Sequence, residues 1–205
     1  GREIAVVDRH SGAVLDRLGP DLGVETPDDL VFGPDGLLYW TEIFTGRIGR
    51  RESDGTVSTV AHLPLGANPI AFNSEGRLFA AVTLFADALY ELDPQGLVPP
   101  RPVLEEPGSL NGFAFGPDGL LYGRTCKPSS EPGGGTEFVW RMDPIKGGQI
   151  PFPASASGHI EYKGYHSPKF HRDGFDVAPN GDVYVIQHIN AKQAHFQAEP
   201  WSASL

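Results

Sequence analysis

The sequence predicts an all-β fold, a β-propeller of four-stranded antiparallel blades, and three observations support this prediction. The turn glycines of the first three copies of a repeat lie 40 and 43 residues apart, about the length of one propeller blade. Glycine (26 residues) and proline (19 residues) are frequent, as is typical of chains with many tight turns and few long helices. The repeat itself resembles a hairpin and occurs four times in the 205 residues, at 28–40, 68–80, 111–123 and 173–185.

Each element of a blade has its own signal. The opening segment 2–19 has two apolar runs and predicts the two outer strands of a preceding blade. In every repeat an apolar run leads into a four-residue turn that ends in glycine, and a second apolar run follows, which predicts a β-hairpin. Two more strand-like runs follow each of the first two hairpins, at 46–53 and 56–63 and at 88–96 and 97–104.

We interpret residues 1–205 as a single propeller domain that covers about four to five blades. The segment 145–171 accounts for the longer spacing of 62 residues before the fourth copy and is predicted to be a long inter-blade loop. A β-sandwich with similar turns is the alternative, but a sandwich does not require a repeat of about 40 residues. Because a propeller ring has to close, we expect a longer protein, missing segments or closure by a partner chain.

Composition and charge exclude several classes of function. The formal net charge of −10 argues against a nucleic-acid partner, because neutralising phosphates requires clustered Lys and Arg. No run of 18 apolar residues is present, so we expect no membrane-spanning helix. Cys126 is the only cysteine, and no signal peptide is recognised, so the sequence leaves the compartment open. The oligomeric state is also left open.

The repeats carry a second pattern, which we call the polar column. One Asp or Asn stands four residues before the apolar anchor of each repeat: Asp28 before Phe32, Asn68 before Phe72, Asn111 before Phe115, and Asp173 before Val177. The first strand of a blade is the innermost one, so we expect these four side chains to converge at one mouth of the central channel. Their oxygens suit a hard divalent cation, Ca²⁺ first, with Mg²⁺, Mn²⁺ and Zn²⁺ as alternatives. In the alternative interpretation, these residues only cap turns and bind nearby backbone.

Three segments also carry a family resemblance. LNGFAFGPDGLLYG, RDGFDVAPNGDVYV and LLYWTEIFTGRIGR resemble the SMP-30/gluconolactonase family of six-bladed propellers, the senescence marker protein-30 and its lactonase relatives. The resemblance extends over residues 28–125 and 172–188. It implies a divalent cation in the channel and a metal-dependent hydrolase that acts on a small-molecule lactone or ester.

The resemblance also implies ligands. Asn111, in its Asn-Gly pair, and Asp173, in its Asp-Gly pair, match two metal ligands of the family. Asp28 stands near the place of an early acidic ligand, where the family has Glu-Gly-Pro and this chain has Asp-Asp-Leu. Either Asp28 or Asp29 is therefore expected to face the metal. Asn68 corresponds to an additional Asn that contacts metal or substrate.

Chemical roles follow from these positions. The metal is expected to polarise a carbonyl group and activate water, and Asp173 is a candidate general base as well as a ligand. His188 is a candidate proton shuttle, with a solvated strand-end histidine as the alternative. His171 and Glu42 are candidate substrate-binding residues, although Glu42 is equally suited to pair with Arg47 or Arg50 on the adjoining strand.

Two further expectations concern packing and function. Aromatic residues of the hairpins, among them Phe32, Phe72 and Tyr39, are expected to pack between blades. Propellers also include non-catalytic binding scaffolds and enzymes of the strictosidine-synthase-like and lyase types, so the sequence leaves these as alternative functions to the hydrolase.

Overall fold

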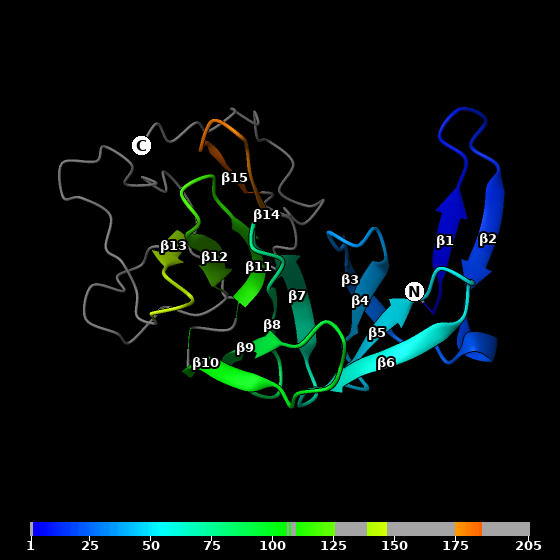
Figure 1. The fold of residues 1–205 in the computed structure, drawn as a ribbon, viewed down its shortest axis with the longest axis horizontal. Coiled ribbons are helices and arrows are strands. Elements are labelled where there is room, and N and C mark those ends of the chain that lie inside the picture. Colours follow the sequence, from blue (N-terminus) through cyan, green and yellow to red (C-terminus); the bar gives the residue numbers. More distant parts are fainter. Residues whose placement is uncertain (1, 106, 108–109, 126–138, 147–174, 186–205) are drawn as a thin grey trace, which may run out of the picture. The chain divides into compact units, whose positions relative to one another are not determined.

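The protein is all-β, with successive antiparallel sheets (Figure 1). The computed structural model describes residues 2–105, 107, 110–125, 139–146 and 175–185. The chain divides into two compact units, Gly1–Glu105 and Glu106–Leu205. Within the described residues, the only helical element is the three-residue 3₁₀ turn η1 (Pro20–Leu22), and no helix is long and apolar enough to cross a membrane.

The first unit contains a hairpin and two four-stranded sheets. In each sheet the strands follow one another in chain order and pair antiparallel, so the predicted blade pattern is confirmed. The opening segment forms the predicted pair of strands. The strands are β1 (Ile4–Val7) and β2 (Val14–Leu18), then β3 (Pro27–Phe32), β4 (Leu38–Glu42), β5 (Arg47–Arg51) and β6 (Val57–His62), then β7 (Ala67–Phe72), β8 (Leu78–Val82), β9 (Ala88–Leu92) and β10 (Arg101–Glu105).

The second unit continues the same pattern. One sheet is formed by β11 (Leu110–Phe115), β12 (Leu121–Thr125) and β13 (Val139–Met142), and a hairpin by β14 (Phe175–Val177) and β15 (Val183–Val185). Most of the predicted loop 145–171 lies outside the described residues; its first two residues belong to the turn that follows β13.

The four hairpin turns have the same geometry, which confirms the alignment of the repeats. In each turn the glycine N–H donates a hydrogen bond of 2.8–3.1 Å to the carbonyl oxygen three residues earlier. The backbone φ of each glycine is positive, between 77° and 92°, a region that only glycine adopts readily. The turn glycines are Gly36, Gly76, Gly119 and Gly181. Each anchor then pairs with the residue six positions later, as Phe32 does with Leu38 and Val177 with Val183.

One hydrophobic cluster of the first unit lies between its two four-stranded sheets, and a second joins Ile4 and Leu18 of the opening hairpin to Trp40 of β4. Tyr39 of β4 packs edge-on against Phe72 of β7, with ring centroids 5.0 Å apart. Ile48, Ile70 and Leu78 are buried in the same cluster. Each such side chain contributes about 1.5–3 kcal/mol by leaving water, so this contact holds the two sheets together.

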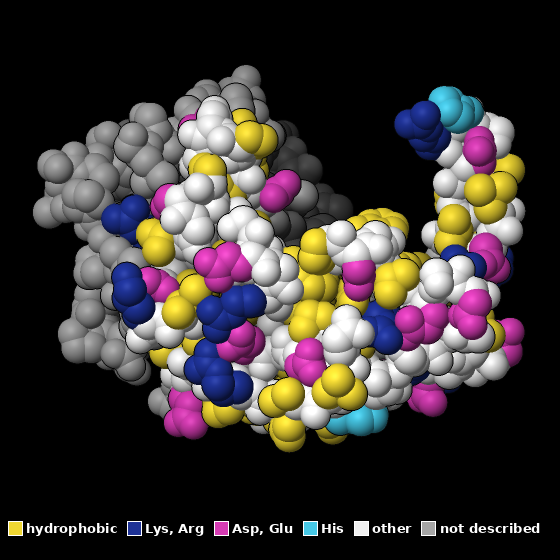
Figure 2. Space-filling model, viewed as in Figure 1, with side chains coloured by type: hydrophobic (Ala, Val, Ile, Leu, Met, Phe, Trp, Pro, Cys, Tyr) yellow, Lys and Arg dark blue, Asp and Glu magenta, His cyan; other side chains and the backbone are white. Residues whose placement is uncertain are grey.

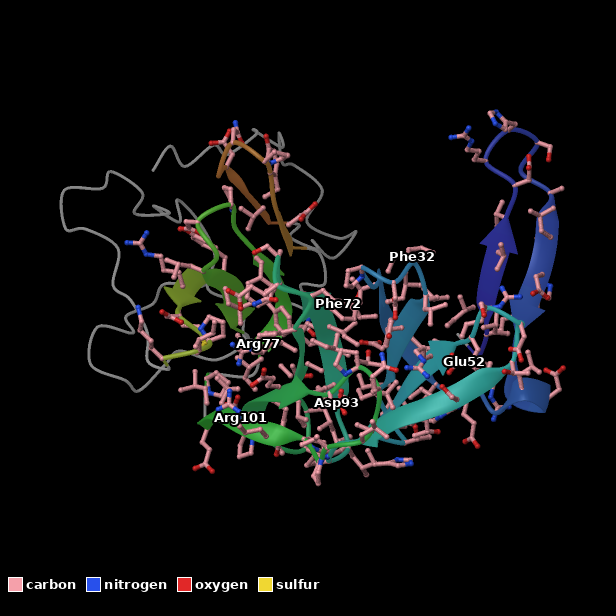
Figure 3. All side chains as sticks on the ribbon, viewed as in Figure 1. Phe32, Glu52, Phe72, Arg77, Asp93 and Arg101 are labelled. Atoms are coloured by element: carbon pink, nitrogen blue, oxygen red, sulfur yellow. The ribbon has the colours of Figure 1, made fainter. Side chains whose placement is uncertain are left out.

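One packing prediction was wrong. Phe32 does not pack between sheets, because its side chain is 67% exposed (labelled in Figure 3). Along β3 exposure alternates, and Phe32 shares the exposed side with Asp28 and Leu30. The reason is positional: Phe72 meets Tyr39 of the preceding sheet, whereas the sheet before β3 contains, in the described part, just β1 and β2.

Candidate functional site

The described members of the polar column lie at β-bulges. In β3 the pairing with β4 shifts between Pro27 and Leu30, so that two residues, Asp28 and Asp29, oppose the single residue Thr41. The same one-residue insertion occurs in β7 between Ala67 and Ile70, at Asn68, and in β11 between Leu110 and Gly112, at Asn111. Bulges re-aim side chains and are frequent beside active sites, so three inner strands present an oxygen-bearing residue with the same local irregularity.

The bulge of β3 also ties the two sheets of the first unit together. The Asp29 carboxylate accepts a hydrogen bond from the backbone N–H of Ile70 on β7, at 3.0 Å, and one from Leu30 at 2.9 Å. Thr41 Oγ1 donates to the backbone carbonyl of Asn68 at 2.6 Å and accepts from the Asp29 N–H at 3.1 Å. Burial raises the pKa of the Asp29 carboxyl above its ordinary value of 3.8, and the two N–H donors act in the opposite direction.

These contacts separate the roles of the two adjacent aspartates. Asp29 is turned toward β7 and satisfies a backbone N–H there, whereas Asp28, on the other side of the strand, is exposed. Asn68 and Asn111 are half-buried at the starts of β7 and β11. Of the two candidates for the early acidic position, Asp28 is the more exposed residue, and the Asp29 carboxylate accepts two backbone hydrogen bonds.

The structure brings Asp28 and Asn68 into one unit and Asn111 into the other. Asp173, His171 and His188 lie outside the described residues, so their predicted roles stay predictions. Within the part of the chain that is described, no three His, Cys, Asp or Glu side chains lie close enough together to hold a metal ion.

Glu42 lies in a buried ion pair. Its side chain is 1% exposed, and its Oε1 lies 3.2 Å from Nη1 of Arg47, the first residue of β5. Trp40 Nε1 donates to the same oxygen at 3.2 Å, and Thr45 Oγ1 donates to Oε2 at 2.9 Å. The alternative in which Glu42 pairs with Arg47 is thus observed, while Arg50 pairs with Glu52.

Sequence reasoning overlooked the loops next to the column. Because Pro27 pairs with Glu42 and Ala67 with Val82, the loops after β4 and β8 lie at the same ends of their sheets as Asp28 and Asn68. These loops carry exposed aromatic residues, Phe44 and Phe85. The alternation of residues along a strand contains no information about the loops. The one sequence signal was that Phe44 and Phe85 are apolar at positions where loops are usually polar.

Comparison with known proteins identifies the fold. No family model and no curated protein matches this chain. Among solved structures, virginiamycin B lyase from Staphylococcus aureus is similar with a TM-score of 0.60 and 15% identity, over 91% of this chain and 56% of that one. A gluconolactonase from Xanthomonas campestris has a TM-score of 0.60 and 20% identity, over 90% and 62% of the respective chains.

An aldose sugar dehydrogenase from Streptomyces coelicolor is similar as well, with a TM-score of 0.52 and 20% identity, over 80% of this chain and 56% of that one. The chain thus spans less than two thirds of the length of these structures. At such identities the likeness establishes the fold, and the predicted β-propeller class is confirmed. The gluconolactonase is consistent with the predicted family resemblance, but the lyase and the dehydrogenase share the same fold, so the likeness is not specific to one family.

Proposed function

We propose that this chain is part of a metal-dependent propeller hydrolase that acts on a small-molecule lactone or ester. The observation that carries the proposal is the repeated bulge: three inner strands insert one residue at the position where the column places Asp28, Asn68 and Asn111. A turn-capping role requires no such insertion, since Asp and Asn cap turns without changing strand register.

The donor set fits a hard divalent cation. Asp28 offers an exposed carboxylate, Asn68 and Asn111 offer amide oxygens at equivalent positions, and Asp173 adds a second carboxylate. Such oxygens favour Ca²⁺, with Mg²⁺, Mn²⁺ and Zn²⁺ as alternatives. When bound, the cation supplies Lewis-acid polarisation of the carbonyl and acidifies water.

The residues of the chain have distinct roles in this proposal. Asp28, Asn111 and Asp173 hold the cation, and Asn68 orients the substrate by hydrogen bonding. Asp173 accepts a proton from the attacking water, and His188 transfers it to solvent or to the leaving oxygen. His171 contacts the substrate. Asp29 holds the bulge in place through its bond to the Ile70 N–H, so that the backbone positions Asp28.

Calorimetric titration with Ca²⁺, Mg²⁺ and Mn²⁺ tests the metal site. We expect removal of a column side chain to weaken binding at least about tenfold. Asp29→Asn, which keeps one of the two acceptor oxygens that hold the bulge, should weaken binding less. The control is Asp21→Asn, which removes one negative charge from an exposed residue of η1. The column variants are Asp28→Asn, Asn111→Ala and Asp173→Ala. Wild-type affinity in all three would remove the column from any metal site.

A panel of lactones and aryl esters, assayed with and without chelator, then tests the reaction. We expect turnover that chelator abolishes and that excess Ca²⁺ restores. Metal binding without turnover of any lactone or ester would refute the hydrolase and leave a binding propeller.

A second candidate function is a lyase. It is supported by the likeness to virginiamycin B lyase over 91% of this chain. Mass spectrometry of the product distinguishes the two, because hydrolysis adds the mass of one water to a cyclic ester and an eliminative ring opening adds none.

A further inference from the structure

Four large apolar side chains are exposed on three neighbouring loops of the first unit. We call them the apolar loop cluster: Phe44 in the β4–β5 loop, Leu65 in the β6–β7 loop, and Leu84 and Phe85 in the β8–β9 loop. Their exposed fractions range from 47% to 63%. Phe44 and Phe85 come from different sheets, yet their ring centroids lie 6.5 Å apart. Figure 2 shows hydrophobic side chains at the surface of this unit near the end of β6.

The loops that carry the cluster are joined to one another by backbone hydrogen bonds. Gly66 N–H donates to the Ile43 carbonyl at 2.7 Å, and Thr83 N–H donates to the Gly66 carbonyl at 2.9 Å, so the three loops form one continuous ladder. The approach at Gly66 is close, because a Cβ there would lie 2.9 Å from the Leu84 nitrogen. The apolar side chains are thus presented on loops that are hydrogen-bonded to one another, and such preorganisation lowers the entropic cost of binding a ligand.

The same backbone contacts place the cluster beside the polar column. The Ile43 and Phe44 N–H groups donate to the carbonyl and hydroxyl oxygens of Thr26, at 3.0 and 3.2 Å, and Thr26 is two residues before Asp28. Gly66, at the centre of the ladder, is two residues before Asn68. A ligand that touches the Asp28 and Asn68 side chains is therefore within reach of the apolar loop cluster.

From this juxtaposition we infer that the site takes a substrate with an apolar tail, a neutral lactone or ester bearing an alkyl or aryl group, rather than a polyhydroxylated sugar lactone. Exposed apolar patches rimmed by polar residues mark ligand sites, and two tilted aromatic rings offer a surface for alkyl and aryl groups. This inference rests on the proposed function and specifies its substrate class.

The test compares γ-butyrolactone, γ-decalactone and glucono-δ-lactone as substrates of the full chain with Ca²⁺ present. We expect kcat/KM to be highest for γ-decalactone. The double variant Phe44→Ser with Phe85→Ser is expected to lower that value about tenfold, mainly through KM, because several methylene groups lose apolar contact. The value for γ-butyrolactone, which has no tail, is expected to stay unchanged. Phe32→Ser is the matched control: Phe32 is also exposed but lies at the other end of β3.

A binding measurement keeps this inference separate from the proposed function. Saturation-transfer NMR with γ-decalactone reports contact with the protein whether or not the lactone is hydrolysed. If no lactone is hydrolysed but the γ-decalactone signal depends on Phe44 and Phe85, the proposed hydrolase function is refuted and the inference of an apolar binding surface is supported. Equal kcat/KM for lactones with and without an alkyl tail would overturn the inference. So would a saturation-transfer signal for γ-decalactone that is unchanged in the double variant. So would a change of sedimentation coefficient in the double variant, because it would assign the cluster to self-association.

Discussion

Replacement of Glu42 tests whether this residue stabilises the fold or binds substrate. Its carboxylate accepts hydrogen bonds from Trp40 Nε1 and Thr45 Oγ1 and pairs with Arg47. The backbone N–H of Glu25 lies 3.4 Å from Oε2 and adds a weak fourth contact. Glu42→Ala removes the acceptor of all these donors, and Glu42→Gln keeps the shape and one carbonyl oxygen but removes the charge.

The expected loss of unfolding free energy follows from the burial of this ion pair. The side chains of Glu42 and Arg47 are 1% and 13% exposed, and removing one partner of a buried pair costs about 3–5 kcal/mol. Arg47 keeps hydrogen bonds to Thr59 Oγ1 at 2.9 Å and to the Ser58 carbonyl at 3.2 Å, so its charge is not left without partners. We therefore expect Glu42→Ala to lower the free energy of unfolding by about 3 kcal/mol, the lower end of that range. For Glu42→Gln we expect about 2 kcal/mol, the loss of hydrogen bonds to a charged group.

Urea denaturation followed by circular dichroism and tryptophan fluorescence measures both values, with Asp21→Asn as the control for charge removal. A double-mutant cycle with Arg47→Met isolates the pairwise energy. The substrate-binding hypothesis makes the opposite prediction: stability unchanged and KM raised. If Glu42→Gln unfolds within about 0.5 kcal/mol of the wild type, a range typical of surface substitutions, the buried ion pair does not stabilise this unit as reasoned here.

Two further predictions concern the first unit. Hydrogen bonding to Arg77 lowers the pKa of Glu91 below its ordinary value of 4.5, so its stabilising effect is present above pH 4.5 and is lost as the pH falls through the lowered pKa. Thermal unfolding should therefore show that Glu91→Gln lowers the free energy of unfolding, relative to the wild type, by less than about 1 kcal/mol at neutral pH. In acid this difference from the wild type should disappear; a difference of the same size at both pH values would contradict this. Gly66→Ala should destabilise more than Gly36→Ala, because both glycines have positive φ but only Gly66 would bring a Cβ within 3.0 Å of backbone, at the Leu84 nitrogen; equal unfolding midpoints in urea would contradict this reasoning.

The sequence was most informative where local chemistry determines local structure. The last turn position has positive φ, which glycine adopts readily, so the hairpins and their register followed from the repeat, down to the pairing of Phe72 with Leu78. The prediction for Phe32 failed because a repeat shows that positions are equivalent but not whether a neighbouring sheet covers them. The partner of Glu42 could not be chosen either, because the choice between Arg47 and Arg50 depends on strand register. The structure pairs Tyr39 with Arg50, which leaves Arg47 next to Glu42.

The bulges could not be predicted from the sequence, for a different reason. A bulge is a feature of strand pairing and leaves no mark on the residue types of a single strand. From the sequence, Asp28 and Asp29 are therefore two ordinary strand positions, and only their pairing opposite Thr41 reveals the bulge. At this insertion, Asp29 accepts a hydrogen bond from the Ile70 N–H and Asp28 is exposed. The geometry of the β3 bulge therefore includes hydrogen bonds to the neighbouring sheet, which the residue types alone do not reveal.

Substitutions in these loops are expected to act differently at buried and at exposed residues. The residues that hold the bulge and the loop ladder, Asp29, Thr41 and Gly66, bond to backbone groups, whereas Phe44 and Phe85 extend into solvent. Substitutions at the exposed rings alter what lies beside the column at little cost to the fold, because surface positions contribute little to stability. Substitutions that remove the Asp29 or Thr41 side chain leave a backbone N–H or carbonyl group without its partner, at about 1–3 kcal/mol each. A side chain at Gly66 would instead clash with the Leu84 nitrogen. If the proposed site is correct, we expect substitutions of Phe44 and Phe85 to change substrate preference and substitutions of Asp29, Thr41 and Gly66 to change stability.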